Sequence, residues 1–234
     1  MTRLATALEL LKKDARPAEL AGMARFGINP EHRLGLSVPA MRRAARILGR
    51  DHALALALWD TGIPDARIVA GMVAEPARLT SRQMDRWARD FSSWDVCDQV
   101  CASAFRGSPL AWRKVPVWAR RRGEFVRRAA FALLATLAVH DREAGDERFV
   151  AMLAVVETAA ADERNCVKKA VSWALRTIGK RSRTLNTEAI ETARRIRQQE
   201  SRAARWIAAD ALRELGSEAV QLRLRGREQA SSQR

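Results

Sequence analysis

The segment Lys169-Ala170-Val171-Ser172-Trp173-Ala174-Leu175 indicates the fold, because two other segments of the chain share its pattern. Arg128–Leu134 begins 41 residues before it, and Trp206–Leu212 begins 37 residues after it. A period of about 40 residues is typical of paired-helix solenoids of the HEAT and armadillo kind. Trp94–Phe105 fits the same frame, which places Asp98 at the position of Arg128 and Lys169. The sequence therefore predicts a HEAT-like solenoid in which these equivalent positions line one concave face.

The remainder of the chain also has the pattern of helices. Apolar residues recur at spacings of three and four, Ala and Leu are frequent, and no stretch alternates with the period of two that strands show. Gly and Pro divide the chain into segments of roughly ten to seventeen residues. We therefore predict an all-α fold, with a single repeat domain over residues 1–228 and a disordered polar tail over residues 229–234.

The composition favours an anionic partner. The 234 residues carry 42 basic and 27 acidic side chains, a formal charge of +15, which suits nucleic acid better than a neutral small molecule. A chain that is enriched in Arg and Ala but has no binding role would carry a similar net charge. The location of the charged residues is therefore more informative than their total charge. No apolar run approaches the roughly 20 residues of a membrane span.

The three cysteines and three histidines lack the spacing of metal ligands. We read Cys97, Cys101 and Cys166 as reduced residues that pack between helices. With no secretory leader at its start, the chain is expected to be a cytoplasmic monomer that associates with the nucleoid when it binds DNA, without a metal or other cofactor.

The segment 166–181 separates cations from apolar residues most clearly. Lys169, Trp173, Arg176 and Lys180 form one stripe of the expected helix, and the opposite stripe is apolar: Val167, Val171, Ala174 and Ile178. Cations interleaved with an indole suit a nucleic-acid backbone, because the cations neutralise phosphates while the ring packs on a sugar or base. Alternatively, Trp173 is the edge of the core between repeats.

A second candidate site lies in Ser92-Ser93-Trp94-Asp95-Val96-Cys97-Asp98. Ser92 and Asp95 have the spacing of a capping box, with Ser92 as the N-cap. Asp98 lies too far along to cap, and it falls one turn from Trp94 on the same helix face. It is either the carboxylate of a functional site or a solvated acid beside a core indole.

Other aromatic and basic residues are less informative. We expect Trp59, Trp87 and Trp206 in the core, whereas Trp112 and Trp118 suit either core or surface. Arg120, Arg121 and Arg122 suit a solvated charge cluster, and Arg128 is distinguished from them by its repeated inward position.

Four segments together resemble the DNA alkylation repair proteins of the AlkD type, a bacterial family of HEAT-like repeats that excise alkylated purines. The resemblance covers about residues 20 to 215 and is carried by Met23–Ile28, Trp94–Asp98, Phe125–Ala130 and Lys168–Arg176. It implies that Asp98 is the catalytic carboxylate, that Trp94 and Trp173 flank the deoxyribose of the lesion, and that Arg128 approaches the DNA backbone. Phe26 stands where some members carry a tyrosine, so a hydroxyl contact is absent there.

The expected function is therefore a monofunctional DNA glycosylase of base excision repair. It would release cationic N3- and N7-alkylpurines from duplex DNA, with Asp98, Trp94 and Trp173 at the reaction and with Arg128, Lys169, Arg176 and Lys180 on the DNA. The family also contains members that bind DNA, including branched DNA, without excising bases. The alternative is accordingly a non-catalytic repeat protein that binds bent or branched DNA by its shape and phosphates. A protein-binding HEAT scaffold is disfavoured by the indoles beside an acid.

Overall fold

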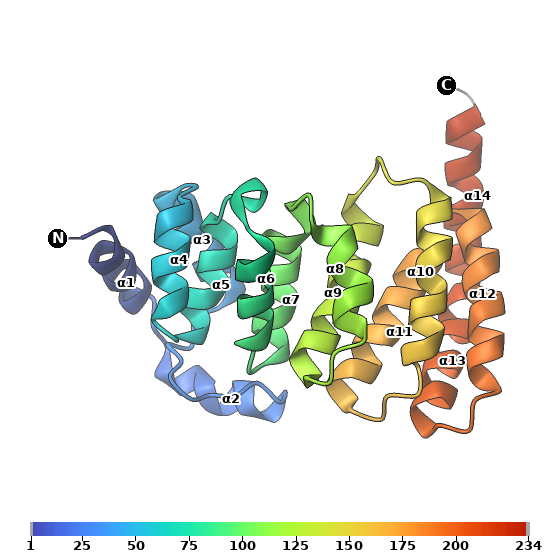
Figure 1. The fold of residues 1–234 in the computed structure, drawn as a ribbon, viewed down its shortest axis with the longest axis horizontal. Helices are drawn as coiled ribbons and strands as arrows, with labels where there is room; N and C mark the ends of the chain where they lie inside the picture. The colour runs from blue at the N-terminus through green and yellow to red at the C-terminus, as the bar shows by residue number, and fades with distance from the viewer. Residues whose placement is uncertain (1, 233–234) are drawn as a thin grey trace. The chain divides into compact units, whose positions relative to one another are not determined.

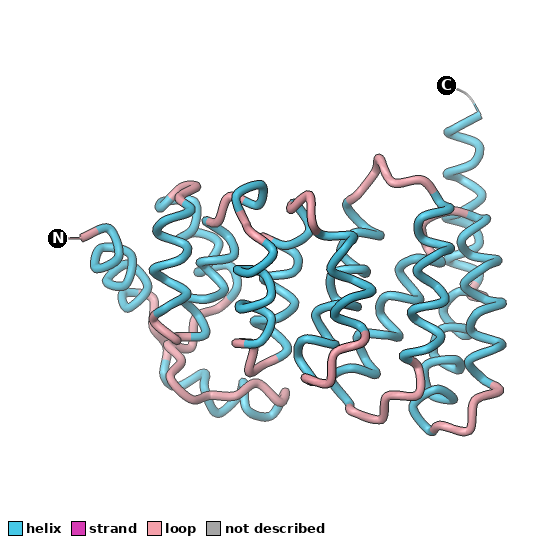
Figure 2. The backbone as a smooth tube through the Cα atoms, in the orientation of Figure 1, coloured by secondary structure: helices cyan, strands magenta, loops and turns pink. Residues whose placement is uncertain are grey.

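The computed structural model describes residues 2–232, except for the side chains of residues 228 and 230–232. These residues form helices and turns with no strand among them, which confirms the all-α prediction (Figures 1 and 2). The chain divides into two compact units, Met1–Ala111 and Trp112–Arg234. Within the described range, no helix has both the length and the apolar content needed to cross a bilayer.

The first unit contains seven α-helices and three short 3-10 turns. Its α-helices are α1 (Arg3–Lys13), α2 (Leu20–Arg25), α3 (Val38–Leu48), α4 (His52–Asp60), α5 (Pro64–Val73), α6 (Ser81–Arg89) and α7 (Trp94–Ser103). The 3-10 turns are η1 (Pro17–Glu19), η2 (Pro76–Arg78) and η3 (Phe105–Gly107).

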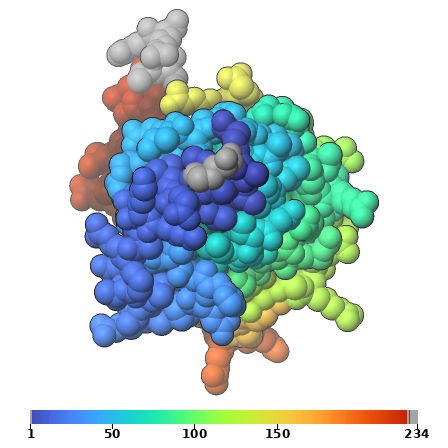
Figure 3. Space-filling view, turned by 90° about the vertical axis from the view of Figure 1, so that its left-hand side faces the viewer, coloured from blue at the N-terminus to red at the C-terminus, as the bar shows by residue number. Residues whose placement is uncertain are grey.

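Helix α5 is the centre of the first unit. It pairs with α4 and packs between α3 and α7, while α1 covers the N-terminal end against α3 and α4 (Figure 3). The core of this unit includes Trp59 of α4 stacked on Trp87 of α6, with ring centroids 4.1 Å apart and planes within 4°. Both indoles are buried, which confirms their prediction as core residues.

The second unit begins within α8 (Ala111–Ala119) and continues through six further helices. These are α9 (Glu124–His140), α10 (Asp146–Ala159), α11 (Asn165–Gly179), α12 (Arg183–Arg197), α13 (Arg202–Leu215) and α14 (Glu218–Ser232). Helices α9, α11 and α13 pack side by side in one row, and α10 and α12 form a second row against it (Figure 1). This is the paired-helix arrangement that the repeat period predicts.

The repeat frame coincides with the helix register. Arg128, Lys169 and Trp206 are each the fifth residue of their helices, α9, α11 and α13, and Asp98 is the fifth residue of α7. The apolar stripe of α11 is fully buried, as expected: Val167, Val171, Ala174 and Ile178. Burying each Val or Ile side chain contributes roughly 1.5–3 kcal/mol, so this stripe sets which face of α11 points inward.

Local signals explain where the helices of the second unit begin and end. Ser182 and Ser201 are N-caps whose hydroxyl groups accept hydrogen bonds from the backbone of α12 and α13. Gly179 ends α11 where a Cβ would lie 2.8 Å from the side chain of Leu215 and 2.9 Å from Cβ of Ala189, so any larger residue would force these neighbours to shift. The predicted tail, 229–234, overlaps the end of α14 at Ser232, and residues 233–234 lie outside the described range.

Candidate functional site

The start of α7 differs from the predicted capping box. Ser93, not Ser92, is the N-cap, and its side chain caps no backbone N–H. Its hydroxyl instead donates a hydrogen bond to Oδ1 of Asp95 at 2.6 Å. Asp95 is therefore at N2 rather than N3, and the assignment of Ser92 and Asp95 as a capping box is wrong. The physical reason is that the carboxylate of Asp95 has a stronger partner than the backbone N–H groups at the start of α7.

That partner is Arg33, whose side chain is only 1% exposed. Its Nη2 lies 2.8 Å from Oδ1 of Asp95, and its Nε donates to the carbonyl of Asn29 at 2.7 Å. The buried carboxylate of Asp65, in the first turn of α5, accepts from the backbone N–H groups of Leu34 and Leu36. The loop that follows α2 is thus held at α5 and at α7. Nothing in the sequence spacing relates Arg33 to Asp95, which are 62 positions apart.

This loop positions the indole of Trp94. Nε1 of Trp94 donates to the backbone carbonyl of Phe26 at 3.0 Å, and the ring stays partly exposed. Asp98 follows one turn later on the same face of α7 and is also partly exposed. The structure therefore brings the predicted indole and carboxylate together at the surface of the first unit. The side chain of Phe26 is 76% exposed at the edge of this surface.

The second predicted group lies on α11 in the second unit. Lys169 is exposed, and Trp173 is half-buried one turn further along. Arg176 and Lys180 have acidic partners from α13: Asp210 lies 3.1 Å from Nε of Arg176, and Glu214 pairs with both cations. Burial raises the pKa of Glu214, but hydrogen bonds from Lys180 and Arg176 outweigh it and hold the pKa below its ordinary value. The exposed part of the stripe is therefore centred on Lys169 and Trp173.

The acidic partners of Arg176 and Lys180 do have a signal in the sequence. Asp210 and Glu214 stand four residues apart on α13, so both fall on one face of that helix. The hydroxyl of Ser172 also donates to Asp210, at 2.9 Å. Acids repeated at i and i+4 opposite a basic stripe would have predicted that part of the stripe is neutralised.

Arg128 is nearly enclosed, with 6% of its surface exposed. Its Nη1 donates to the carbonyl of Cys166 at 2.6 Å, which ties α9 to the first turn of α11. This contact gives Arg128 a structural role that the sequence did not indicate. Burial raises the pKa of the neighbouring Cys166 thiol, which is consistent with a reduced cysteine.

Trp206 does not lie in the core, and that prediction is wrong. The indole is 42% exposed, and Nζ of Lys168 lies 4.9 Å from its ring centroid. The reason is its register, because Trp206 occupies the fifth position of α13, equivalent to the exposed Lys169 of α11. The repeat alignment already contained this information. Of the two undecided indoles, Trp118 is buried, whereas Trp112 is half-buried and donates to Asp141 at 2.8 Å.

A further basic cluster surrounds the start of α11. Asp162 accepts from Arg127 at 2.9 Å and from Arg164 at 2.6 Å. Burial raises the pKa of Asp162, but the hydrogen bonds and charge of Arg164, together with the charge of Arg127, lower it further than burial raises it. Arg120, Arg121 and Arg122 are exposed beside this cluster, as predicted for a solvated charge group.

The sequence matches the model of one protein family over most of its length. Residues 7–215 fit the family described as DNA alkylation repair enzyme. The chain belongs to the DNA alkylation repair enzyme family. No curated protein sequence matches it. Within the described residues, no cluster of three or more His, Cys, Asp or Glu side chains could hold a metal ion.

One solved structure agrees with this family at the level of the fold. It is described as a new family of proteins related to the HEAT-like repeat DNA glycosylases, with affinity for branched DNA structures. It is 20% identical, covers 90% of this chain and 94% of its own, and has a TM-score of 0.73. A designed armadillo repeat protein covers 76% of this chain and 92% of its own at 15% identity, with a TM-score of 0.34. The match to the first of these structures, together with the helical repeats described above, shows the predicted HEAT-like fold.

Proposed function

We propose that this member of the DNA alkylation repair enzyme family is a DNA glycosylase that releases cationic N3- and N7-alkylpurines from duplex DNA. The observation that supports this most is the pairing of Trp94 and Asp98 on one face of α7. Both side chains are partly exposed, and the indole is held by its hydrogen bond to Phe26. An aromatic ring and a carboxylate one turn apart suit a substrate that carries positive charge.

The chemistry needs few groups from the protein. Alkylation at N3 or N7 makes the purine a cation and a good leaving group, so the glycosidic bond breaks without an acid that protonates the base. Positive charge then develops on the deoxyribose, where the carboxylate of Asp98 stabilises it electrostatically. Asp98 also orients a water for attack on the sugar, as a carboxylate does in glycoside hydrolysis. The departing base keeps the electron pair of the broken C1′–N bond, and water supplies the hydroxyl group of the abasic product and gives its proton to Asp98 and then to solvent. The reaction requires no cofactor.

Aromatic side chains add to this stabilisation. Trp94 and Trp173 would face the charged sugar and contribute about 0.5–2 kcal/mol each through cation–π contact, depending on how far the site is desolvated. Trp94 is oriented by Phe26, so its contribution is preorganised rather than gained on binding. The half-buried position of Trp173 on α11 leaves one part of its ring accessible to DNA.

The four predicted cations would contribute unequally to DNA binding. Lys169 is exposed and is the strongest candidate for a phosphate contact. Arg176 and Lys180 would bind phosphate as members of a network with Asp210 and Glu214, so each contributes less net charge. Arg128 would act mainly by fixing α11 through the carbonyl of Cys166.

The second candidate is a binding protein without excision activity. The solved relative with affinity for branched DNA shares this fold. The acids of α13 also reduce the positive charge along α11, and Phe26 offers no hydroxyl group to a lesion. Such a protein would hold DNA by its shape and phosphates alone.

One product assay separates these functions. Purified protein is incubated with methylated duplex DNA, and free 7-methylguanine and 3-methyladenine are separated and quantified over time. A glycosylase releases either base above the spontaneous rate, and the abasic product cleaves on heating in alkali. Tight binding of DNA with release at only the spontaneous rate would replace this proposal with the binding function.

A further inference from the structure

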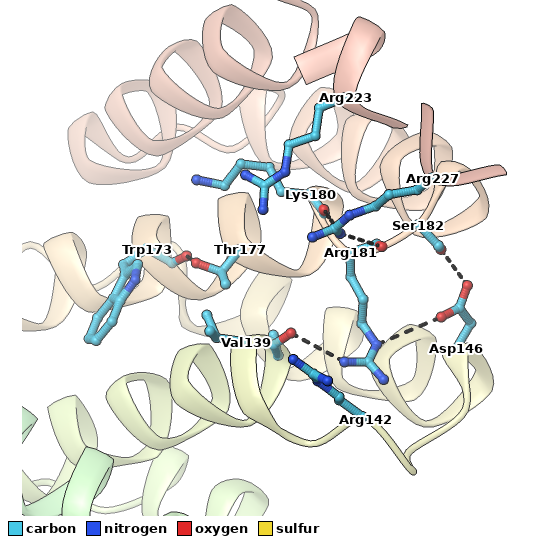
Figure 4. Close-up of a pocket in the computed structure, with 11 residues that line it drawn as sticks. Val139, Arg142, Asp146, Trp173, Thr177, Lys180, Arg181, Ser182, Arg223 and Arg227 are labelled. Carbon is cyan, nitrogen blue, oxygen red and sulfur yellow. Dashed lines mark hydrogen bonds and ion pairs between the residues drawn. The ribbon is translucent and has the colours of Figure 1, made fainter. Parts of the chain in front are cut away.

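A basic pocket opens in the second unit beside Trp173 (Figure 4). It has a volume of about 600 Å³ and is lined by the end of α9, the start of α10, the end of α11 and α14. Its cationic lining comprises Arg142, Lys180, Arg181, Arg223 and Arg227, against a single carboxylate, Asp146. Figure 4 shows Arg223 and Arg227 entering from α14, with Arg142 on the opposite wall.

Three of these cations form hydrogen bonds or ion pairs with other groups of the protein. Lys180 pairs with Glu214 at 2.5 Å, and Nη2 of Arg181 donates to the carbonyl of Ala144 at 2.7 Å. Arg227 donates to the carbonyls of Lys180 and Arg181, both at 3.0 Å. These bonds shape the floor of the pocket and hold α14 against the end of α11.

The other two cations can bind an anion that enters the pocket. Arg142 and Arg223 are exposed, and among the described residues neither forms an ion pair with a carboxylate. Burial lowers the pKa of Arg227, and the nearby charges of Arg223 and Arg181 lower it further. The pocket is therefore a place where like charges crowd together, and an anion bound between them would relieve that repulsion.

We propose that this pocket holds a phosphate group of one DNA strand between Arg142 and Arg223, which extends the DNA-binding surface beyond Trp173. This inference rests on the proposed binding of DNA but not on base excision. A planar guanidinium binds phosphate through two N–H groups, and two such groups facing one pocket give a geometrically specific site.

Size and neighbouring residues favour a nucleotide over a free ion. A pocket of about 600 Å³ is in the range of sites for whole small molecules rather than for a single phosphate ion. Trp173 and Thr177 form its wall on α11, about two turns and one turn before Lys180, respectively. An indole at one end and cations at the other match a nucleotide, with the sugar or base on the ring and its phosphate among the arginines.

The double variant R142Q/R223Q tests this proposal with little risk to folding, because both side chains are exposed. The apparent Kd for a fluorescent undamaged duplex is measured by anisotropy at several salt concentrations. Loss of one phosphate contact should lower the slope of log K against log salt by about 0.9, which is roughly an eightfold weaker affinity at 0.1 M salt. Arg197→Gln is the matched control, because this exposed residue ends α12 about 21 Å from the pocket end of that helix.

One further measurement defines the ligand. Tryptophan fluorescence is titrated with inorganic phosphate. A reduced salt slope with weak binding of inorganic phosphate supports a DNA phosphate site. An unchanged salt slope overturns it, and tight binding of inorganic phosphate in that case assigns the pocket to a free anion. Failure of the parent to excise would remove only the proposed glycosylase activity, because the salt slope is measured on undamaged DNA.

Discussion

The ion pair between Arg33 and Asp95 provides the sharpest test of how the α7 surface is held. If Asp95 only capped α7, Asp95→Asn would cost at most about 1 kcal/mol of stability. The structure instead gives Asp95 a partner whose side chain is 1% exposed, at 2.8 Å. Removing one member of a buried pair leaves an uncompensated charge and costs about 3–5 kcal/mol. The two roles therefore predict different magnitudes for the same substitution.

Urea unfolding of a double-mutant cycle measures this difference. Asp95→Asn and Arg33→Met should each lower the free energy of unfolding by about 3–5 kcal/mol, whereas the double variant should lose much less than the sum. Asp60→Asn is the control, because its pair with Arg86 is 56% exposed on both sides and should contribute at most about 1 kcal/mol. A loss below about 1 kcal/mol in Asp95→Asn, with additive single effects, would refute the buried-pair account.

Three other perturbations have direct readouts. Lys169→Ala should weaken binding to damaged and undamaged duplexes equally and lower the salt slope by about 0.9, because a phosphate contact carries no sequence information; an unchanged slope in anisotropy titrations would contradict this. Glu214→Gln should raise DNA affinity and steepen the salt dependence, because it removes the carboxylate that pairs with Arg176 and Lys180; weaker binding at unchanged melting temperature would oppose this. The depressed pKa of Asp162 means that its stabilising effect is present above about pH 4 and is lost as the pH falls through its folded pKa. Asp162→Asn should therefore flatten the acid-side loss of stability in melting curves, and equal acid sensitivity in parent and variant would count against it.

The fold could be predicted because its determinants are periodic. The register of Arg128, Lys169 and Trp206 follows from spacing alone, and each is the fifth residue of its helix. The buried stripe of α11 follows from the spacing of apolar residues in the same way. Even Trp206 could have been placed at the surface, had the repeat been preferred over the general tendency of indoles to be buried.

The details of the site could not be predicted because they depend on contacts between distant segments. Arg33 reaches Asp95 across 62 positions, and Arg128 reaches the carbonyl of Cys166 across 38 positions. Neither contact leaves a mark in local spacing, since each depends on how a loop or helix packs. The pocket lined by Arg142 and Arg223 likewise joins the loop between α9 and α10 to α14. Sequence patterns identified which residues share a helix face, but not which acids and cations neutralise one another.

The proposed role of Asp98 is to stabilise the charge that develops when an alkylated base leaves. Its most direct test is single-turnover release of 7-methylguanine from methylated duplex DNA by the parent and by Asp98→Asn, with Asp60→Asn as an exposed acid-to-amide control. Asparagine keeps the shape of the side chain but removes its charge, so release should fall by at least about 100-fold, the loss typical of one preorganised electrostatic group. DNA affinity should stay equal or rise slightly, because a carboxylate repels phosphates. Release by Asp98→Asn at the rate of the parent would contradict the catalytic role of Asp98.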